Sequence, residues 1–478
     1  MKKAFLFLFP YVVIVSVVAF TFSSCKKVKV LKEGGEISFS TDTLTFDTVF
    51  TSIGSFTNSV KIYNKQNQPI VLSEIKLAGG EATPFRLNVD GLPGKEFHDI
   101  ELAANDSMYV FVAVTIDPTT GTMPFLVEEK LQVTLNEKRF ELPLEAYGQD
   151  AHYIVDSVLS SATWVNDKPY VIIHSALVDS GETLTIQKGC RIYMHQDSKL
   201  YVAGTLLAYG TKKDSIIFQG DRLDRAYFGY KDFPGEWGGL VFTTSSVWNN
   251  LNYCIIKNAG NATGFGYPSA IHVSNVEAIG NQPKLELTNC TIFNSAGYGV
   301  IAFASQLKFG NTLIHSCNMQ CLALVEGGNY EFNYCTFANY GALGINHAQE
   351  PTLAAINFRE TAPSTYTGTD LNAAFHNCLI YGSLDDESAF NKLDNWGCSI
   401  LLNHCLLKRT TALPAFVQTN NTLLNKDPEF KGSGKFDFHV ETTSPAKNAG
   451  VFHPYYLKDL DDKLRSTSTP TIGCYEAD

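Results

Sequence analysis

The sequence predicts an all-β protein in which a β-sandwich precedes a parallel β-solenoid, and three observations support this class. Residues 37–149 alternate apolar and polar side chains in short runs, with Gly, Asn and Asp breaks about every 8–12 residues. From about residue 150, a motif recurs that consists of an apolar residue, two polar or aromatic residues, Cys, any residue and another apolar residue. Finally, 45% of the 478 residues are hydrophobic and 18% are charged, which suits a large folded core rather than disorder.

The N-terminus has the features of an export signal. Two lysines open the chain, residues 4–22 are apolar, and two serines precede Cys25. An apolar run of this length also suits an uncleaved membrane span, but Pro10 and the ending at Cys25 disfavour that alternative. The ending resembles the lipobox of bacterial lipoproteins. This resemblance implies a signal peptide over residues 1–24, acylation of Cys25, and a lipidated tether over residues 25–36.

The charge balance limits the partners. The formal net charge is −11, and loss of the signal peptide with its two lysines gives −13. A chain this acidic is not expected to bind nucleic acid or an anionic lipid surface. The resemblance to lipoproteins places the chain on the outer membrane through its lipid. The residues just after Cys25 are basic, so both the periplasmic face and the cell-surface face remain open.

Residues 37–149 supply the strands of the predicted sandwich. The runs at 59–64, 108–114 and 131–135 show the period of two that a half-buried strand requires. No cysteine lies between residues 26 and 189, so no cysteine pair joins the two predicted sheets. The pattern resembles the immunoglobulin-like domains that lead many bacterial surface proteins. The resemblance implies a spacer or docking role rather than catalysis.

Residues 150–478 supply the solenoid. Successive motifs are 18 to 43 residues apart, which is the range of solenoid repeats. We place the motif at a sharp corner, where Asn tolerates a left-handed backbone and the following Cys points inward. Coils stacked at ~4.8 Å would then place Cys above Cys. The six motif cysteines are Cys254, Cys290, Cys317, Cys335, Cys378 and Cys405.

The start and the end of this region resemble the right-handed parallel β-helix repeat proteins of the Bacteroidetes. The segments that carry the resemblance are 183–193, 200–210, 215–218, 235–240, 427–430, 436–440, 444–450, 459–465 and 472–476. With the N-terminal features, the chain resembles a β-helix repeat lipoprotein. The fold implied is all-β: an immunoglobulin-like β-sandwich over 37–149, then a right-handed parallel β-helix with a C-terminal cap over 150–478. No activity is implied, because β-helices host lyases, hydrolases and adhesins alike.

The cysteines and histidines of the solenoid are interpreted as structural. We expect the ten cysteines after Cys25 to form a buried, reduced ladder, although an oxidising periplasm leaves disulfides open. The pair Cys317 and Cys321 lacks a partner pair at metal-site spacing, and we predict neither a metal nor a cofactor. Three histidines fall at or near coil corners: His315, His376 and His404.

Acidic and aromatic residues are the side chains that a polysaccharide site would need. A β-helix hydrolase needs a pair of convergent carboxylates. Two loops gather charge, and we interpret both as solvated: Asp221, Arg222, Asp224 and Arg225 in one, and Asp385, Asp386, Glu387 and Asp394 in the other. The acids of residues 459–462 are assigned to the cap. Aromatic faces stack on sugars, and the predicted glycan-binding aromatics are Trp237, Trp248 and Tyr267.

Five tripeptides of Asp, Ser or Thr, and an apolar residue exceed the about one or two that average composition predicts. They resemble the O-glycosylation sequon of exported Bacteroidetes proteins. The hydroxyl residues that this resemblance marks are Thr43, Thr48, Ser107, Ser157 and Ser215.

We therefore expect a lipid-anchored envelope protein that serves as a non-catalytic scaffold or binding module for a glycan or protein partner. One alternative is a polysaccharide lyase or glycoside hydrolase that acts on an acidic glycan. Another is an accessory subunit of an outer-membrane complex.

Overall fold

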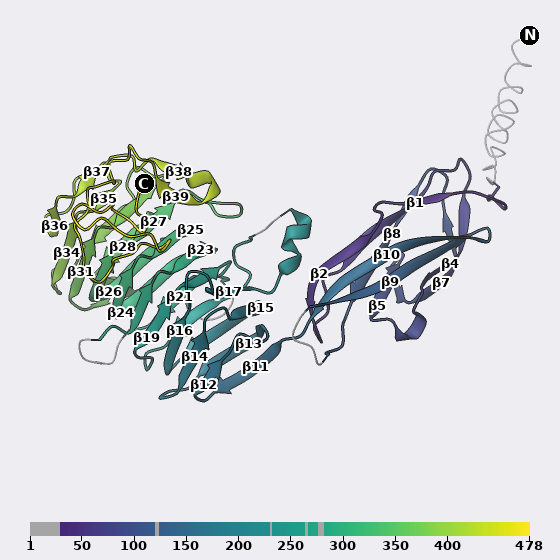
Figure 1. Cartoon of the computed structure of the whole chain (residues 1–478), viewed down its shortest axis with the longest axis horizontal. Coiled ribbons are helices and arrows are strands. Elements are labelled where there is room, and N and C mark those ends of the chain that lie inside the picture. Colours follow the sequence, from purple (N-terminus) through teal and green to yellow (C-terminus); the bar gives the residue numbers. More distant parts are fainter. Residues whose placement is uncertain (1–28, 120–123, 230–231, 263–265, 276–281) are drawn as a thin grey trace, which may run out of the picture. The chain divides into compact units, whose positions relative to one another are not determined.

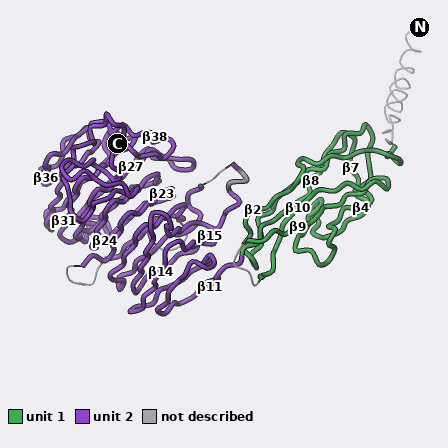
Figure 2. The backbone as a smooth tube through the Cα atoms, viewed as in Figure 1, with its two compact units in different colours: residues 1–119, 124–149 green, residues 120–123, 150–478 purple. Residues whose placement is uncertain are grey.

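The computed structural model describes residues 29–119, 124–229, 232–262, 266–275 and 282–478. It confirms the predicted all-β class, with antiparallel sheets followed by a long parallel sheet. The chain divides into two compact units, which Figure 2 shows in different colours: apart from residues 120–123, the first ends at Gln149 and the second begins at Asp150. The predicted signal peptide and Cys25 lie outside the described residues.

The first unit is a sandwich of two five-stranded sheets, ordered β1-β3-β8-β5-β6 and β2-β10-β9-β4-β7 (Figure 1). Strand pairs are antiparallel except for β2 with β10, which is parallel. Alternate side chains point inward to form one apolar core between the sheets, as the period of two predicts. The sandwich is compatible with an immunoglobulin-like fold. Its elements are β1 (Ile37–Phe39), β2 (Leu44–Phe50), β3 (Asn58–Asn64), β4 (Ile70–Leu77), η1 (Gly80–Ala82), β5 (Phe85–Val89), β6 (Leu92–Gly94), β7 (Glu96–Leu102), β8 (Ser107–Val114), β9 (Phe125–Leu135) and β10 (Lys138–Gln149).

Residues 29–36 belong to the sandwich, although the sequence assigns them to a tether. The backbone N–H of Leu31 donates to the Pro69 carbonyl at 2.9 Å, and the Asn136 side-chain amide donates to the Gly34 carbonyl, also at 2.9 Å. The side chain of Leu31 packs against the core. Partial burial of this leucine favours docking of the segment over free extension into solvent.

The second unit is a parallel β-helix with three faces, built from a 25-stranded sheet in which each strand pairs with the equivalent strand of the next coil. Five long strands bend at a corner and contribute to two faces: β11 (His152–Leu159), β13 (Tyr170–Val178), β15 (Arg191–Val202), β24 (Tyr298–Gly310) and β26 (Leu322–Asn333).

The first face contains the first halves of β11, β13 and β15, then β17 (Ile216–Gly220), β20 (Cys254–Lys257), β23 (Thr291–Ser295), β25 (Leu313–Cys317), β27 (Thr336–Asn339), β32 (Leu379–Gly382), β35 (Leu406–Leu407) and β37 (Leu423–Leu424). The second face contains the second halves of β11, β13 and β15, then β18 (Gly239–Phe242), β21 (Ser269–Val273), the first halves of β24 and β26, β28 (Leu353–Ile356) and β33 (Ser388–Asn391).

The third face contains β12 (Ala162–Trp164), β14 (Thr183–Gln187), β16 (Thr205–Tyr209), β19 (Asn249–Asn252), β22 (Leu285–Thr288), the second halves of β24 and β26, β31 (Leu371–His376), β34 (Cys398–Asn403) and β36 (Val417–Asn420). Outside the faces lie η2 (Leu223–Phe228), η3 (Ser433–Lys435) and two hairpins: β29 (Phe358–Ala362) with β30 (Thr365–Gly368), and β38 (Phe430–Gly432) with β39 (Asp437–Val440). No helix in the described part of the chain is long and apolar enough to cross a bilayer.

The predicted corner lies between the third and the first face. From the coil of Tyr253 onward, one residue per coil there has a positive φ, and Cys or Thr follows it: Tyr253, Asn289, Asn311, Tyr334, Asn377, His404 and Asn421. The Cys290 thiol contacts the Cys254 thiol of the preceding coil, and the Cys378 thiol contacts those of Cys335 and Cys405. The predicted cysteine ladder is therefore confirmed at five positions.

The sixth motif cysteine, Cys317, was placed at the wrong corner. Ser316 has a φ of 52°, and Cys317 ends β25 where the first face turns into the second. Its thiol is paired with Cys321 and not with the ladder. The two corners look alike in sequence because each places an inward residue directly after a left-handed one.

The C-terminal segment, residues 426–478, was predicted to be a cap, but its contacts run along the side of the β-helix. Apolar side chains of the segment pack on the outer surface of the first face. Polar contacts reach from early coils to late ones: Lys212 with Asp461, Tyr253 with Asp462, Asn311 with Arg465, and Asn377 with Val451.

Candidate functional site

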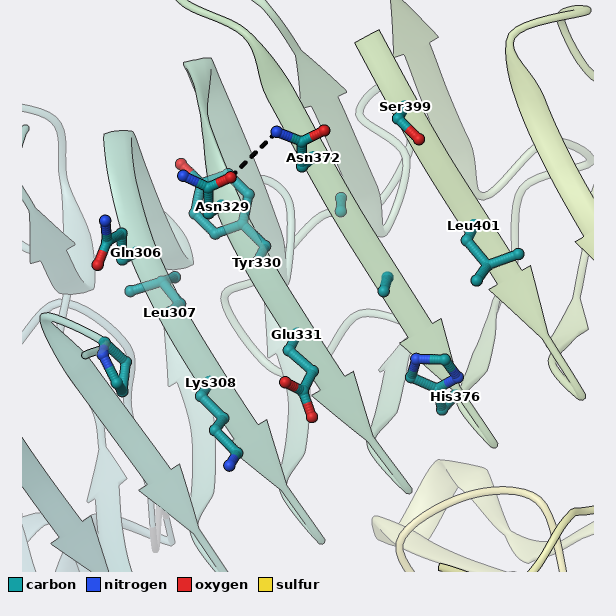
Figure 3. Close-up of a pocket in the computed structure, with 13 residues that line it drawn as sticks. Gln306, Leu307, Lys308, Asn329, Tyr330, Glu331, Asn372, His376, Ser399 and Leu401 are labelled. Atoms are coloured by element: carbon teal, nitrogen blue, oxygen red, sulfur yellow. Dashed lines mark hydrogen bonds between the residues drawn. The ribbon is translucent and has the colours of Figure 1, made fainter. Parts of the chain in front are cut away.

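A hollow of about 710 Å³ lies on the outer surface of the third face, over β24, β26, β31 and β34 (Figure 3). Its residues come from strands that are neighbours in the helix but far apart in sequence. They are Pro283, Gln306, Leu307, Lys308, Asn329, Tyr330, Glu331, Asn372, Ala373, Ala374, His376, Ser399 and Leu401. We call this hollow the groove.

One row of the groove carries a hydrogen-bonding side chain on every strand. The row consists of Gln306, Asn329, Asn372 and Ser399, which face one another across successive coils (Figure 3). The Asn372 amide donates to the Asn329 side-chain oxygen at 3.0 Å. Because coils repeat at ~4.8 Å, the row offers a polar group at regular intervals along the helix axis.

A second row, two residues further along each strand, carries charge and then apolar side chains. Lys308 and Glu331 are partners on adjacent strands, followed by Ala374 and Leu401. The carboxylate of Glu331 accepts a hydrogen bond from the Asn333 amide at 2.8 Å. Both rows exist because side chains at alternate positions of a strand point outward. The first row lies six residues, and the second row four residues, before the corner cysteine or threonine of each coil.

The corner end of the groove is organised by a chain of hydrogen bonds. The Asn420 amide donates to the Asn403 oxygen at 2.7 Å, and the Asn403 amide donates to Nδ1 of His376 at 3.0 Å. In this network Nδ1 of His376 is an acceptor, so Nε2 carries the proton. Burial lowers the pKa of His376, and its imidazole is neutral at pH 7.

A second hollow of about 460 Å³ continues the groove toward the corner with the second face. It shares Gln306, Asn329 and Asn372 with the groove and adds Thr369 and Asp370. Gly328 forms this edge with a φ of +116°, and a Cβ there would lie 2.4 Å from the Ser305 carbonyl oxygen. The edge therefore requires glycine.

The groove has the chemistry of a binding surface. Of the residues that line the first hollow, all of which the structure describes, only Glu331 is acidic. The second hollow adds Asp370, whose carboxylate accepts the Gly397 N–H at 2.7 Å. A regular row of amides and a hydroxyl suits a polymer rich in hydroxyl groups that lies along the helix axis.

Tyr267, one of the three predicted glycan-binding aromatics, lines a separate pocket of about 280 Å³ on the second face. Its ring lies 5.0 Å from that of Phe303, centroid to centroid. Arg359 and Glu326 form an ion pair in the same pocket, with Nε to Oε1 at 2.5 Å. Burial lowers the pKa of His272, which also lines it, to about 4.

The other two predicted aromatics do not join Tyr267. Trp237 was wrongly predicted to present its ring to a sugar, because it is fully buried in the β-helix core and its indole N–H donates to the Lys257 carbonyl at 2.8 Å. Trp248 is 54% exposed in the turn between β18 and β19. The prediction for Trp237 rested on its place beside a long insertion, which does not decide whether its ring points outward or into the core.

The first charged loop was predicted to be solvated, but Asp224 is buried, and the loop consists of separate ion pairs. Arg222 pairs with Asp224 at 2.7 Å, and Asp221 pairs with His195 at 2.6 Å. Arg225 pairs with Glu236 at 3.1 Å, and burial raises the pKa of Glu236 to about 7. Because each of these acids has its own partner, the loop does not present two free carboxylates to a substrate.

The second charged loop is also divided. Glu387 was predicted to be solvated, but it is fully buried and accepts hydrogen bonds from Thr352 and from Nε2 of His347 at 3.0 Å. Asp386 binds two threonine hydroxyls, and Asp394 is exposed and pairs with Lys392. Burial of Glu387 is possible because donors from three segments satisfy its carboxylate.

The five predicted O-glycosylation residues are half-buried and are distributed over both units, so they form no single site. The hydroxyls of Ser157 and Ser215 donate to the carbonyls of Val155 and Thr211, at 2.8 and 3.2 Å. Their modification stays a prediction. The remaining sequon residues are Thr43, Thr48 and Ser107.

The predicted structural histidines lie in different surroundings. His315 is buried under the C-terminal segment between Phe293 and Phe438, and burial lowers its pKa to about 3. His376 lines the groove, and His404 is a corner residue. The ten cysteines after Cys25 are free thiols, and in the described ranges no cluster of three or more histidine, cysteine or acidic side chains could hold a metal ion.

No protein-family model and no curated protein matches this chain. Solved structures that resemble part of it include the SafA pilin in complex with the SafB chaperone from Salmonella enterica, at 12% identity over 26% of this chain and 58% of that chain, with a TM-score of 0.18. A family 123 glycoside hydrolase from Clostridium perfringens matches at 9% identity over 25% of this chain and 30% of that chain, with a TM-score of 0.16. A PapD-like domain of human CEP192 matches at 11% identity over 27% of this chain and 94% of that chain, with a TM-score of 0.17. Likenesses of this size carry no argument about function.

Proposed function

We propose that this protein is a lipid-anchored envelope protein of the outer membrane whose groove binds an extended glycan without cleaving it. The observation that carries the proposal is the row of Gln306, Asn329, Asn372 and Ser399, which repeats hydrogen-bonding groups at the coil spacing. Successive sugar residues of a polysaccharide that follows the helix axis would each meet one side chain of this row. The small apolar side chain of Ala374 leaves room for a ligand above the strands that line the groove.

The test is glycan binding by the chain without its signal peptide and Cys25, residues 26–478. Native electrophoresis in gels that contain single polysaccharides would compare the wild type with the double variant Asn329→Ala and Asn372→Ala. Loss of two or more hydrogen bonds should weaken binding about tenfold or more. Gln187→Ala, an exposed amide on the third face outside the groove, is the matched control. The proposal would be contradicted if every glycan that retards the wild type in the gel retarded the double variant equally.

A catalytic role is the second candidate, because Lys308, Glu331 and His376 bring titratable groups from adjacent strands to one end of the groove. Incubation with acidic polysaccharides, followed by assays for reducing ends and unsaturated products, tests it. We expect no turnover. Product formation that Glu331→Gln abolishes would replace the binding proposal with a lyase or hydrolase.

The anchor is proposed from the resemblance at Cys25 and is tested separately. We expect the intact mass of the protein from membranes to show an acylated N-terminal cysteine, and Cys25→Ala to release the protein from the membrane fraction. Because residues 29–36 pack on the sandwich, only residues 25–28 remain to separate a lipid from the folded unit, which is at most about 14 Å of extended chain. Crosslinking in cells tests the remaining alternative, membership of an outer-membrane complex.

A further inference from the structure

The sheet β1-β3-β8-β5-β6 of the sandwich exposes adjacent aromatic rings on its outer face. Tyr109 and Phe111, on β8, are 48% and 41% exposed, and their ring centroids are 5.9 Å apart. Tyr63 lies on the neighbouring strand β3, opposite Ser107. Isolated exposed aromatics are ordinary, but adjacent rings on one sheet face are typical of a contact surface.

On β1, β3, β5 and β8, which are described in full, the outward side chains include positive charge and no acid. Lys61 is opposite Tyr109, with Nζ 4.6 Å from the centre of its ring, and Arg86 is on β5. By contrast, residues 37–149 as a whole contain eight basic and fifteen acidic side chains. The side chains that alternate outward on the four strands β1, β3, β5 and β8 are Ser38, Ser59, Lys61, Tyr63, Arg86, Asn88, Ser107, Tyr109, Phe111 and Ala113.

The outer face of the other sheet carries acidic side chains. Glu128 on β9 is cross-strand from Glu145 on β10, and Glu141 on β10 binds Lys130 at 2.8 Å. The outer face of the sheet β1-β3-β8-β5-β6, which we call the aromatic face, is therefore a local exception in an acidic unit. An acidic ligand is attracted to it and repelled by the rest of the sandwich.

We propose that this aromatic face docks an acidic polysaccharide. The exposed parts of the stacked Tyr109 and Phe111 rings can pack against the C–H groups of sugar rings. Lys61 and Arg86 lie on either side to bind carboxylate or sulfate groups. The hydroxyls of Ser59 and Ser107 and the Asn88 amide around the rings can exchange hydrogen bonds with sugar hydroxyls.

A protein partner fits this face less well. A stable protein interface buries about 800 Å² on each side around a desolvated apolar centre. Here the apolar centre consists of three rings and Ala113, and polar hydroxyl and amide side chains surround it. An elongated, hydrated and charged ligand matches such a narrow surface.

The experiment uses residues 26–478 with both units intact. Native gels that contain polygalacturonate, alginate or neutral dextran would compare the wild type with two double variants, Tyr109→Ala with Phe111→Ala, and Lys61→Ala with Arg86→Ala. We expect each double variant to weaken binding to the acidic polymers at least about tenfold. Wild-type binding to these polymers should also fall as salt rises. The matched control is Leu126→Ala with Tyr147→Ala, which removes side chains that are 46% and 45% exposed on the other sheet.

The aromatic face and the groove can fail independently. The groove variant Asn329→Ala with Asn372→Ala should retain the binding that depends on Tyr109 and Phe111. Wild-type affinity of the Tyr109 and Phe111 variant for every acidic polymer would overturn the proposal. Binding to vesicles of phosphatidylcholine with one-third phosphatidylglycerol that the same substitutions abolish, without binding to any polysaccharide, would overturn it in favour of a membrane surface.

Discussion

Lys284 is fully buried, and its ammonium joins two neighbouring coils. Nζ donates to the carbonyl oxygens of Thr243 at 2.6 Å, Thr244 at 3.3 Å, Ser274 at 3.0 Å and Asn275 at 2.9 Å. These carbonyls follow β18 and β21, two adjacent strands of the second face. The substitution Lys284→Met keeps most of the side-chain length and removes the charged donor.

The expected loss is large because the acceptors remain buried. A hydrogen bond to a charged group contributes about 1.5–3 kcal/mol, and an unpaired buried polar group costs about 1–3 kcal/mol. The saving from not desolvating the ammonium offsets part of this sum. We therefore expect Lys284→Met to lower the free energy of unfolding of the β-helix by about 4 kcal/mol.

Urea unfolding followed by tryptophan fluorescence measures this loss in the right unit. All four tryptophans lie in the β-helix, at Trp164, Trp237, Trp248 and Trp396, so the sandwich does not contribute to the signal. Lys308→Met, a half-buried lysine of the groove, is the control and should change stability by less than about 0.5 kcal/mol. A loss below about 1 kcal/mol for Lys284→Met would refute the reasoning, since it would mean that the four carbonyls find other donors.

Three further predictions concern the C-terminal segment and the sequons. Burial lowers the pKa of His315 to about 3, so the unfolded state takes up a proton below the unfolded pKa of about 6.5 while the folded state does not, and the free energy of unfolding should fall by about 2.5 kcal/mol between pH 7 and pH 4.5. Urea unfolding should show a smaller fall for His315→Phe, and an equal fall would contradict this. Arg465→Met should speed tryptic cleavage at Lys458, because the guanidinium that lies 4.0 Å from the Tyr334 ring centre holds the segment down, whereas Lys435→Met, which removes an exposed charge, should not. The intact mass of protein from its native host should exceed the mass of the acylated chain by whole sugar units, and a mass without this excess would reject modification at Thr43, Thr48, Ser107, Ser157 and Ser215.

The corner of the β-helix could be predicted because its physical requirement is local. A left-handed residue followed by a small inward one recurs in the sequence, as at Asn289 with Cys290 and at Asn377 with Cys378. The same local rule cannot tell one corner from another, which is why Cys317 was misplaced. Nor can it show that Trp237 folds inward, since that depends on how an insertion packs against the core.

The groove could not be predicted because outward positions of strands are usually polar for reasons of solubility alone. Asn329 and Asn372 become noticeable only when the register of β26 with β31 places them side by side. That register follows from the corner positions, since each asparagine lies six residues before a corner cysteine. Counting six residues back from Cys335 and from Cys378 identifies both asparagines in the sequence.

The path of the C-terminal segment changes how the solenoid is expected to unfold. Stacked coils touch only their neighbours, so such an array can lose its end coils one at a time. Here a single segment joins the coil of Lys212 to the coils of Asn311 and Asn377 through contacts that are remote in sequence. If any one of these coils unfolds, part of the C-terminal segment must also detach from the other coils. The β-helix should therefore behave as one cooperative unit rather than as a chain of independent repeats.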